Sequence, residues 1–299
     1  MMSALCIALI ATSAALACTH DGKNGIFPEN NLWIPVGQGK DSATEQEFMA
    51  AIDKMTKQYS PVFEAQGRSL KIFPKWDDGT VNAYAKRNGR VSEIYMFGGL
   101  ARHELVTKDA FMLVICHEMG HHLGGFPKSS DWASNEGQSD YFATLKCARE
   151  VWKDEPNMNF NAFLEVPEVV RTSCQKGFTK PEEIGLCARA AMAGKALGDT
   201  LASLGKQKPT DFTTPDTNVV SRTNNEHPAG QCRTDTYFAG AVCPVSKDAP
   251  LSDTDAKAGT CEQTAGADFG VRPLCWYKPG EQGGGGGGGG GTTWPRLRR

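Results

Sequence analysis

The feature that most constrains the fold is the motif HEMGH at residues 117–121, which ends an apolar run at residues 110–116. Thr107 and Asp109 precede the run in the pattern of a helix N-terminus, and Gly124 follows it in the pattern of a helix end. Because the first half of this helix is apolar nearly all round, we expect it to be buried. Polar side chains that enter a buried helix cost free energy unless they are paired or bind a metal ion.

The two histidines of the motif point to a metal site. His117 and His121 lie one helical turn apart on the same face, so both imidazoles can reach one ion. Glu118 lies about 100° around the helix from His117, beside the ion, where a carboxylate can take a proton from an activated water. The pattern predicts one Zn²⁺ per chain and a hydrolase with Glu118 as its base. His122 points away from His121 and is expected to be a supporting or surface residue.

A site of this kind needs a third protein ligand. The metzincin pattern HExxHxxGxxH would place a histidine where this chain has Pro127, so that pattern is excluded. Glu136 begins a helix expected to run to about residue 152 and is the preferred ligand over Asp131 and Asp140. Asp140 lies one turn after Glu136 and can accept a hydrogen bond from a ligand histidine. A carboxylate at Glu136 could alternatively serve only the first helical turn.

Four blocks of sequence carry a resemblance to a known family. In order they are residues 81–85 (VNAYA), residues 93–100 (EIYMFGGL), the HExxH helix and residues 135–143 (NEGQSDYFA). Over about residues 70–150 the chain resembles the HtpX and CAAX-prenyl-protease type of gluzincin peptidase. No counterpart of that family's membrane helices is present in the sequence, and the gap between HExxH and the glutamate is short.

The resemblance implies roles for individual residues. It makes His117, His121 and Glu136 zinc ligands, Glu118 the base, and Asp140 the residue that orients a ligand. It also implies that Asn82 and Ala83 belong to an edge strand along which an extended protein or peptide substrate pairs. The family's oxyanion-stabilising residue has no match. The open candidates are Tyr95, Tyr141 and His227, of which His227 is more simply explained as a surface-loop residue.

The remaining patterns predict an α+β fold. Apolar residues recur at helical spacing between residues 42 and 67, at Phe48, Ile52, Met55, Tyr59 and Val62. Residues 69–74, 81–86 and 91–97 predict a roughly three-stranded sheet, with a hairpin turn at Asn88-Gly89. An Ala-rich helix is expected over 181–205. The expected fold is a small gluzincin core of amphipathic helix, sheet, HExxH helix and glutamate helix, with a disulfide-stapled C-terminal region.

The chain is expected to divide into four parts. Residues 1–17 resemble a signal peptide, residues 18–209 form the zinc metallopeptidase domain, 210–280 a Cys-rich module and 281–299 a Gly-rich tail. Cys18 after the cleavage site allows a lipid anchor, although Ala15 departs from the lipoprotein pattern. We expect a secreted, periplasmic or cell-envelope protein without a transmembrane span. The net charge of −2 and the absence of a basic patch give no reason to expect nucleic acid.

The cysteines fit an oxidising compartment. Four of them lie in a polar stretch that needs cross-links to hold a shape, and three pairings are possible for Cys232, Cys243, Cys261 and Cys275. Two of Cys147, Cys174 and Cys187 are expected to pair. Cys116 is expected to be a small buried core residue.

These observations lead to one expected function and one alternative. The first is a secreted zinc metalloendopeptidase. The second is a catalytically latent or inactive peptidase-fold binding protein of the cell envelope, plugged by its C-terminal module.

Overall fold

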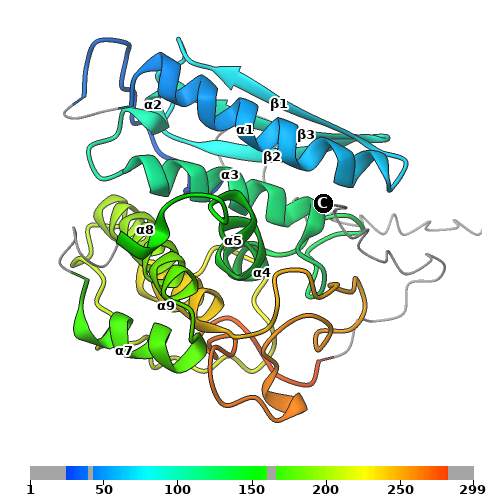
Figure 1. Cartoon of the computed structure of the whole chain (residues 1–299). Coiled ribbons are helices and arrows are strands. Elements are labelled where there is room, and N and C mark those ends of the chain that lie inside the picture. The colour runs from blue at the N-terminus through cyan, green and yellow to red at the C-terminus, as the bar shows by residue number, and fades with distance from the viewer. Residues whose placement is uncertain (1–24, 40–42, 160–165, 282–299) are drawn as a thin grey trace, which may run out of the picture.

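The computed structural model describes residues 25–39, 43–159 and 166–281. The fold is α+β, with a three-stranded sheet beside a set of packed helices (Figure 1). The main elements in chain order are α1 (Glu45–Glu64), β1 (Ser69–Lys75), β2 (Ala83–Asn88), β3 (Val91–Phe97), α2 (Gly98–Ala101), α3 (Lys108–Leu123), α4 (Glu136–Phe142), a π-helical turn η1 (Ala143–Cys147), α5 (Ala148–Val151), α7 (Glu168–Gly177), α8 (Pro181–Leu204) and α9 (Gly230–Val242). Single 3-10 turns occur at η2 (Asn157–Asn159) and η3 (Gln263–Ala265). The expected signal peptide (1–17), Cys18 and nearly all of the Gly-rich tail lie outside the described residues.

The predicted amphipathic helix is confirmed as α1. It begins with a capping box formed by Thr44 and Glu47, and its apolar residues at positions 48, 52, 55, 59 and 62 are all buried. Helix α1 packs on β1 and contacts α3. The spacing of apolar residues was therefore sufficient to place this helix against the sheet.

The sheet has the order β1-β3-β2, so β2 lies at an edge. Strand β1 runs parallel to β3, and β2 pairs antiparallel with β3 through the predicted turn, which sets Asn88 opposite Val91. One face of the sheet belongs to the main core, to which it contributes Leu70, Ala83, Ile94 and Met96. The other face carries stacked aromatic rings of Phe73, Tyr95 and Tyr84, with centroids 4.5 and 4.6 Å apart.

Helix α3 lies between the sheet and the other helices. Figure 1 shows the sheet and α1 on one side of α3, with α4, α8, α9 and the C-terminal segment on the other. Thr107 caps its first turn by accepting a hydrogen bond from Ala110 N at 3.1 Å, and every residue from Ala110 to Leu123 is buried. The helix ends at Leu123 with Gly124 as its cap, as the sequence predicted.

The C-terminal region packs on the same core. Helix α9 contacts α8, α4 and η1, and Tyr237, Ala241 and Val242 belong to the main core cluster. Among the helices of the described ranges, none combines the length and apolar character needed to cross a bilayer.

Four disulfides cross-link the described chain: Cys116–Cys147, Cys174–Cys187, Cys232–Cys275 and Cys243–Cys261. The prediction that two of Cys147, Cys174 and Cys187 pair is confirmed by the Cys174–Cys187 bond. Cys116 is buried as predicted, but the expectation of a simple core thiol was wrong. Because α3 and η1 pack together, its Cα lies 5.5 Å from that of Cys147, a separation that a disulfide spans.

Candidate metal centre

Helices α3 and α4 bring together the three side chains predicted as metal ligands. Nε2 of His117 lies 3.3 Å from Glu136 Oε2, and Nε2 of His121 lies 3.5 Å from Glu136 Oε1. All three side chains are buried, and one donor atom from each lies within 4.8 Å of the others. Gly120 permits this approach of the helices, because a Cβ there would lie 2.8 Å from Ser139 Cα.

The donor atoms fit a zinc ion. Bonds of about 2.0–2.1 Å in a tetrahedral site place the donor atoms roughly 3.3 Å apart. The Nδ1 atom of His117 lies 2.7 Å from Asp140 Oδ1, and that of His121 lies 2.8 Å from the Ser134 carbonyl oxygen. A proton on each Nδ1 leaves the Nε2 lone pair directed at the cluster. In the described part of the chain, His117 Nε2 is buried and makes no hydrogen bond, which is the state expected of a ligand atom.

Asp140 is itself fixed by an arginine that the sequence did not indicate. Arg233 of α9 donates from Nε to Asp140 Oδ2 and from Nη2 to Oδ1, each at 2.7 Å, and both side chains are fully buried. Burial raises the pKa of Asp140, but Arg233 and His117 outweigh it and hold the pKa below its ordinary value. The carboxylate therefore stays charged and can hold His117 in one orientation.

Glu118 lies in the same buried region without a partner. Neither of its carboxylate oxygens makes a hydrogen bond to the described residues. Burial raises the pKa of Glu118 to about 8, with His117 opposing the rise and Glu136 adding to it. A carboxyl group in this state can both take up and release a proton near neutral pH.

His227 is the residue that the sequence reasoning undervalued. Its Nε2 atom lies 3.3 Å from Glu136 Oε2 and donates a hydrogen bond to the Gly25 carbonyl oxygen at 2.6 Å. All three oxyanion candidates donate a hydrogen bond within the described chain, Tyr95 to Glu93 and Tyr141 to the Gly270 carbonyl oxygen, but His227 is the one that lies beside Glu136. His227 had only a neighbouring proline as a signal, and its place depends on contacts across the whole chain.

The predicted substrate edge is partly filled by the chain itself. Ile26 N donates to the Ala83 carbonyl oxygen at 2.9 Å, and Phe27 N donates to Asn82 Oδ1 at 3.1 Å. Gly25 lies so close that a Cβ would be 1.8 Å from the Ala83 oxygen. Residues 25–27 therefore occupy the pairing positions of Asn82 and Ala83.

The other sequence candidates lie apart from this cluster. Asp131 is exposed and lines a different pocket, together with His122 and Leu123 at the C-terminal end of α3. His122 is buried, not on the surface, and its Nε2 lies 3.2 Å from the Glu93 carbonyl oxygen. Comparison with models of protein families, with curated proteins and with solved structures found no match for this chain.

Proposed function

We propose that the chain is a zinc-dependent metalloendopeptidase. The observation that carries the proposal is the buried set of His117, His121 and Glu136, with the unpartnered carboxylate of Glu118 beside it. Two imidazoles and a carboxylate are the donor set typical of catalytic zinc. Such an ion, when bound, polarises a carbonyl group and lowers the pKa of water.

The protein residues would divide the remaining chemistry. Glu118 accepts the proton of the attacking water and delivers it to the leaving amine. Asp140, held by Arg233, keeps His117 in the tautomer that presents Nε2. His227 is the candidate donor to the oxygen that gains negative charge, an interaction worth roughly 10²–10³ in rate in other hydrolases.

We further propose a secreted or cell-envelope location. The four disulfides are typical of proteins from oxidising compartments. Residues 1–17 have the pattern of a signal peptide, and a lipid anchor at Cys18 stays a minor alternative.

A latent or non-cleaving peptidase fold is the second candidate. It is favoured by the way the chain fills its own site, with His227 from the C-terminal region beside Glu136 and residues 25–27 on the edge of β2. In that state the protein would bind zinc and cleave nothing until these segments move.

Cleavage of a mixed peptide library tests the proposal. The mature chain should contain one zinc per molecule and cut peptides, and a chelator should abolish cutting. Glu118→Gln should keep the zinc and lose about 10²–10⁴ of the rate, which is the usual contribution of a general base. Glu104→Gln, at an exposed position, is the matched control and should behave as wild type.

The outcomes separate the two candidates. Cleavage by Glu118→Gln at the native rate would contradict the proposed role of that residue. A chain that binds zinc and cuts no peptide would favour the latent form, and a chain that binds no zinc would overturn both.

A further inference from the structure

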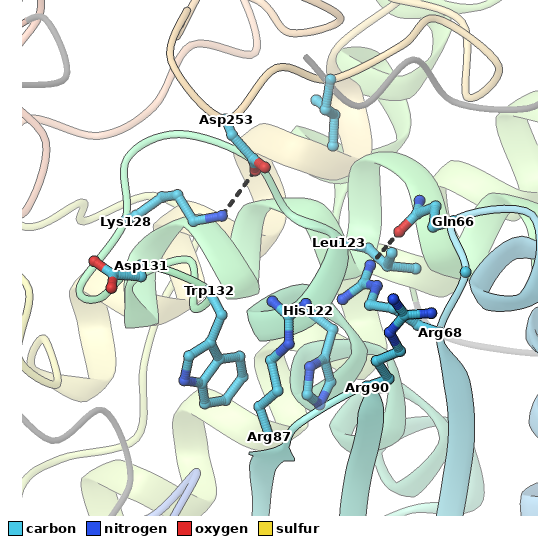
Figure 2. Close-up of a pocket in the computed structure, with 13 residues that line it drawn as sticks. Gln66, Arg68, Arg87, Arg90, His122, Leu123, Lys128, Asp131, Trp132 and Asp253 are labelled. Atoms are coloured by element: carbon cyan, nitrogen blue, oxygen red, sulfur yellow. Dashed lines mark hydrogen bonds and ion pairs between the residues drawn. The ribbon is translucent and has the colours of Figure 1, made fainter. Parts of the chain in front are cut away.

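A second cavity lies at the C-terminal end of α3 and is distinct from the metal centre. Its volume is about 450 Å³, and it is open to solvent on one side. Figure 2 shows that Arg68, Arg87 and Arg90 reach it from the sheet, beside His122, while Lys128 and Asp253 lie across it. We call this cavity the arginine pocket.

The three arginines have no acidic partner. Within the described residues, no carboxylate forms an ion pair with any of them, and Arg68 donates instead to the neutral side chain of Gln66. Burial, followed by repulsion from Arg87, lowers the pKa of Arg68 to about 10. Arg68 and Arg87 are half-buried and Arg90 is exposed; gathering like charges in this way opposes folding, and a bound anion would relieve that cost.

The acidic residues of the pocket offset this charge only in part, since Asp253 raises the pKa of Arg68 but burial and Arg87 outweigh it. Asp253 accepts an ion pair from Lys128 at 2.8 Å, on the side opposite the arginines (Figure 2). Asp131 is exposed at the rim. The side nearest the sheet therefore keeps three unpaired guanidinium groups, which suit bidentate binding of a carboxylate.

The wall beside the arginines also offers a hydrogen-bond acceptor. His122 stacks on Trp132 with ring centroids 4.9 Å apart, and its Nε2 carries the proton that faces the Glu93 carbonyl oxygen. Its Nδ1 is buried and has no hydrogen-bond partner among the residues described. Because this nitrogen is covered, a ligand N–H or O–H group would reach it only after a shift of the His122 ring, and the arginines are what define the ligand as an anion.

Strand β2 links the arginine pocket to the metal centre. The Ala83 carbonyl oxygen points away from β3, where it accepts from Ile26 N, and by the alternation of an antiparallel pair the backbone groups of Ala85 and Arg87 point to the same edge. Ala83 meets Ile26 next to the contact between Gly25 and His227, close to Glu136. Four residues of strand cover about 13 Å. A peptide paired with this edge would thus extend from Arg87 towards the metal centre, and it would pair at Ala83 itself only where residues 25–27 give up that position.

We propose that the arginine pocket binds a carboxylate of an extended peptide paired with β2, and so makes the protein select acidic peptides. The carboxylate comes either from an acidic side chain or from the C-terminus of the peptide. This inference rests on the proposed peptidase function for the position of the cleaved bond, but not for the binding itself.

Binding of matched peptides to the zinc-loaded Glu118→Gln protein tests the inference, because this variant should not consume them. The first two peptides have amidated C-termini and differ only by Glu or Gln at one position, which is scanned along the sequence. The third has Gln throughout and a free C-terminal carboxylate. In calorimetric titrations we expect either the Glu peptide or the peptide with the free C-terminus to bind about 10-fold more tightly than the amidated Gln peptide. This ratio corresponds to about 1.4 kcal/mol. High salt should reduce the difference.

Arginine variants identify the pocket as the source of the preference. Adding Arg87→Gln should abolish the 10-fold difference, whereas Arg222→Gln, at an exposed site outside the pocket, should leave it intact. Equal affinity for all peptides, or a preference that survives Arg87→Gln in a folded protein, would overturn the inference.

The same peptides separate this inference from the proposed function. Arg87-dependent binding of an acidic peptide to a chain that cleaves nothing would support the pocket and contradict the peptidase. Equal cleavage of acidic and neutral peptides by the wild type would support the peptidase and contradict the pocket.

Discussion

Arg233 is a buried residue that supports the candidate metal centre through Asp140 and is not itself one of the proposed ligands. Its guanidinium holds both oxygens of Asp140 and also donates to the Ile26 carbonyl oxygen at 2.5 Å. One side chain thus connects α9, α4 and the N-terminal segment next to Ala83. Asp140 in turn owes its lowered pKa first to this arginine and then to His117.

Arg233→Met should therefore weaken both folding and zinc binding. It leaves the buried carboxylate of Asp140 without its partner, which costs about 3–5 kcal/mol, and it frees His117, which should lower zinc affinity about 10–100-fold. Urea denaturation and competition with a chromophoric chelator measure the two effects. Arg171→Met, which removes an exposed ion pair with Glu168, should cost less than about 1 kcal/mol. An Arg233→Met protein with native stability and native zinc affinity would refute this role.

At the scale of elements, the π-helical turn η1 connects the metal-binding helix α4 to the C-terminal loops. Lys146 in this turn donates to the carbonyl oxygens of Ser246 and Ala249 at 2.7 and 3.0 Å. Burial, followed by the charges of Arg149 and Lys247, lowers the pKa of Lys146 to about 7. Asp248 opposes these effects and favours a higher pKa. The folded protein therefore releases this proton more easily than the unfolded chain.

This shift predicts a pH dependence of stability. Between pH 7 and about 10.4, the unfolded chain holds a proton that the folded protein has lost, so the free energy of unfolding rises with pH by at most about 1.4 kcal/mol per unit. Below pH 7 both the folded and the unfolded chain hold the proton, so Lys146 gives the free energy of unfolding no slope with pH. Urea denaturation at pH 7, 8 and 9 should give a smaller slope for Lys146→Met than for the wild type. Lys57→Met, at an exposed position of α1, should keep the wild-type slope, and an unchanged slope in Lys146→Met would contradict the assignment.

At the scale of the whole molecule, the features that could be predicted from the sequence are those set by residues close together in the chain. Helix α1, the strands, the Asn88-Gly89 turn and the start and end of α3 follow from spacing and capping within a few residues. The His117–His121 pair follows from helical geometry. The places of His227, Arg233 and residues 25–27 at the site could not be predicted, because the contacts that fix them join residues 55 to 207 positions apart.

Residues after 210 contribute to the candidate metal centre as well as being cross-linked among themselves. They supply His227 and Arg233, and Trp276 packs its fully buried ring on Gly137, the residue after Glu136. Cys232 at the start of α9 is bonded to Cys275, next to this tryptophan. The ring, the disulfide and the ion pair therefore act on the same end of α4.

Trp276→Ala should for this reason disturb the whole molecule and not only its C-terminal part. Loss of a buried tryptophan ring costs about 3–5 kcal/mol, and the gap beside Gly137 should let Glu136 move and weaken zinc binding. We expect one unfolding transition, at which circular dichroism and zinc release change together, because the small cluster around Trp276 is joined to α4 through Gly137 and to α9 through the Cys232–Cys275 bond, and both helices contribute to the main core. Trp33→Ala, at a ring that is 62% exposed, should leave both nearly unchanged. If Trp276→Ala instead produced two transitions, with zinc retained through the first, the C-terminal region would be a separate unit and the metal centre would not depend on it.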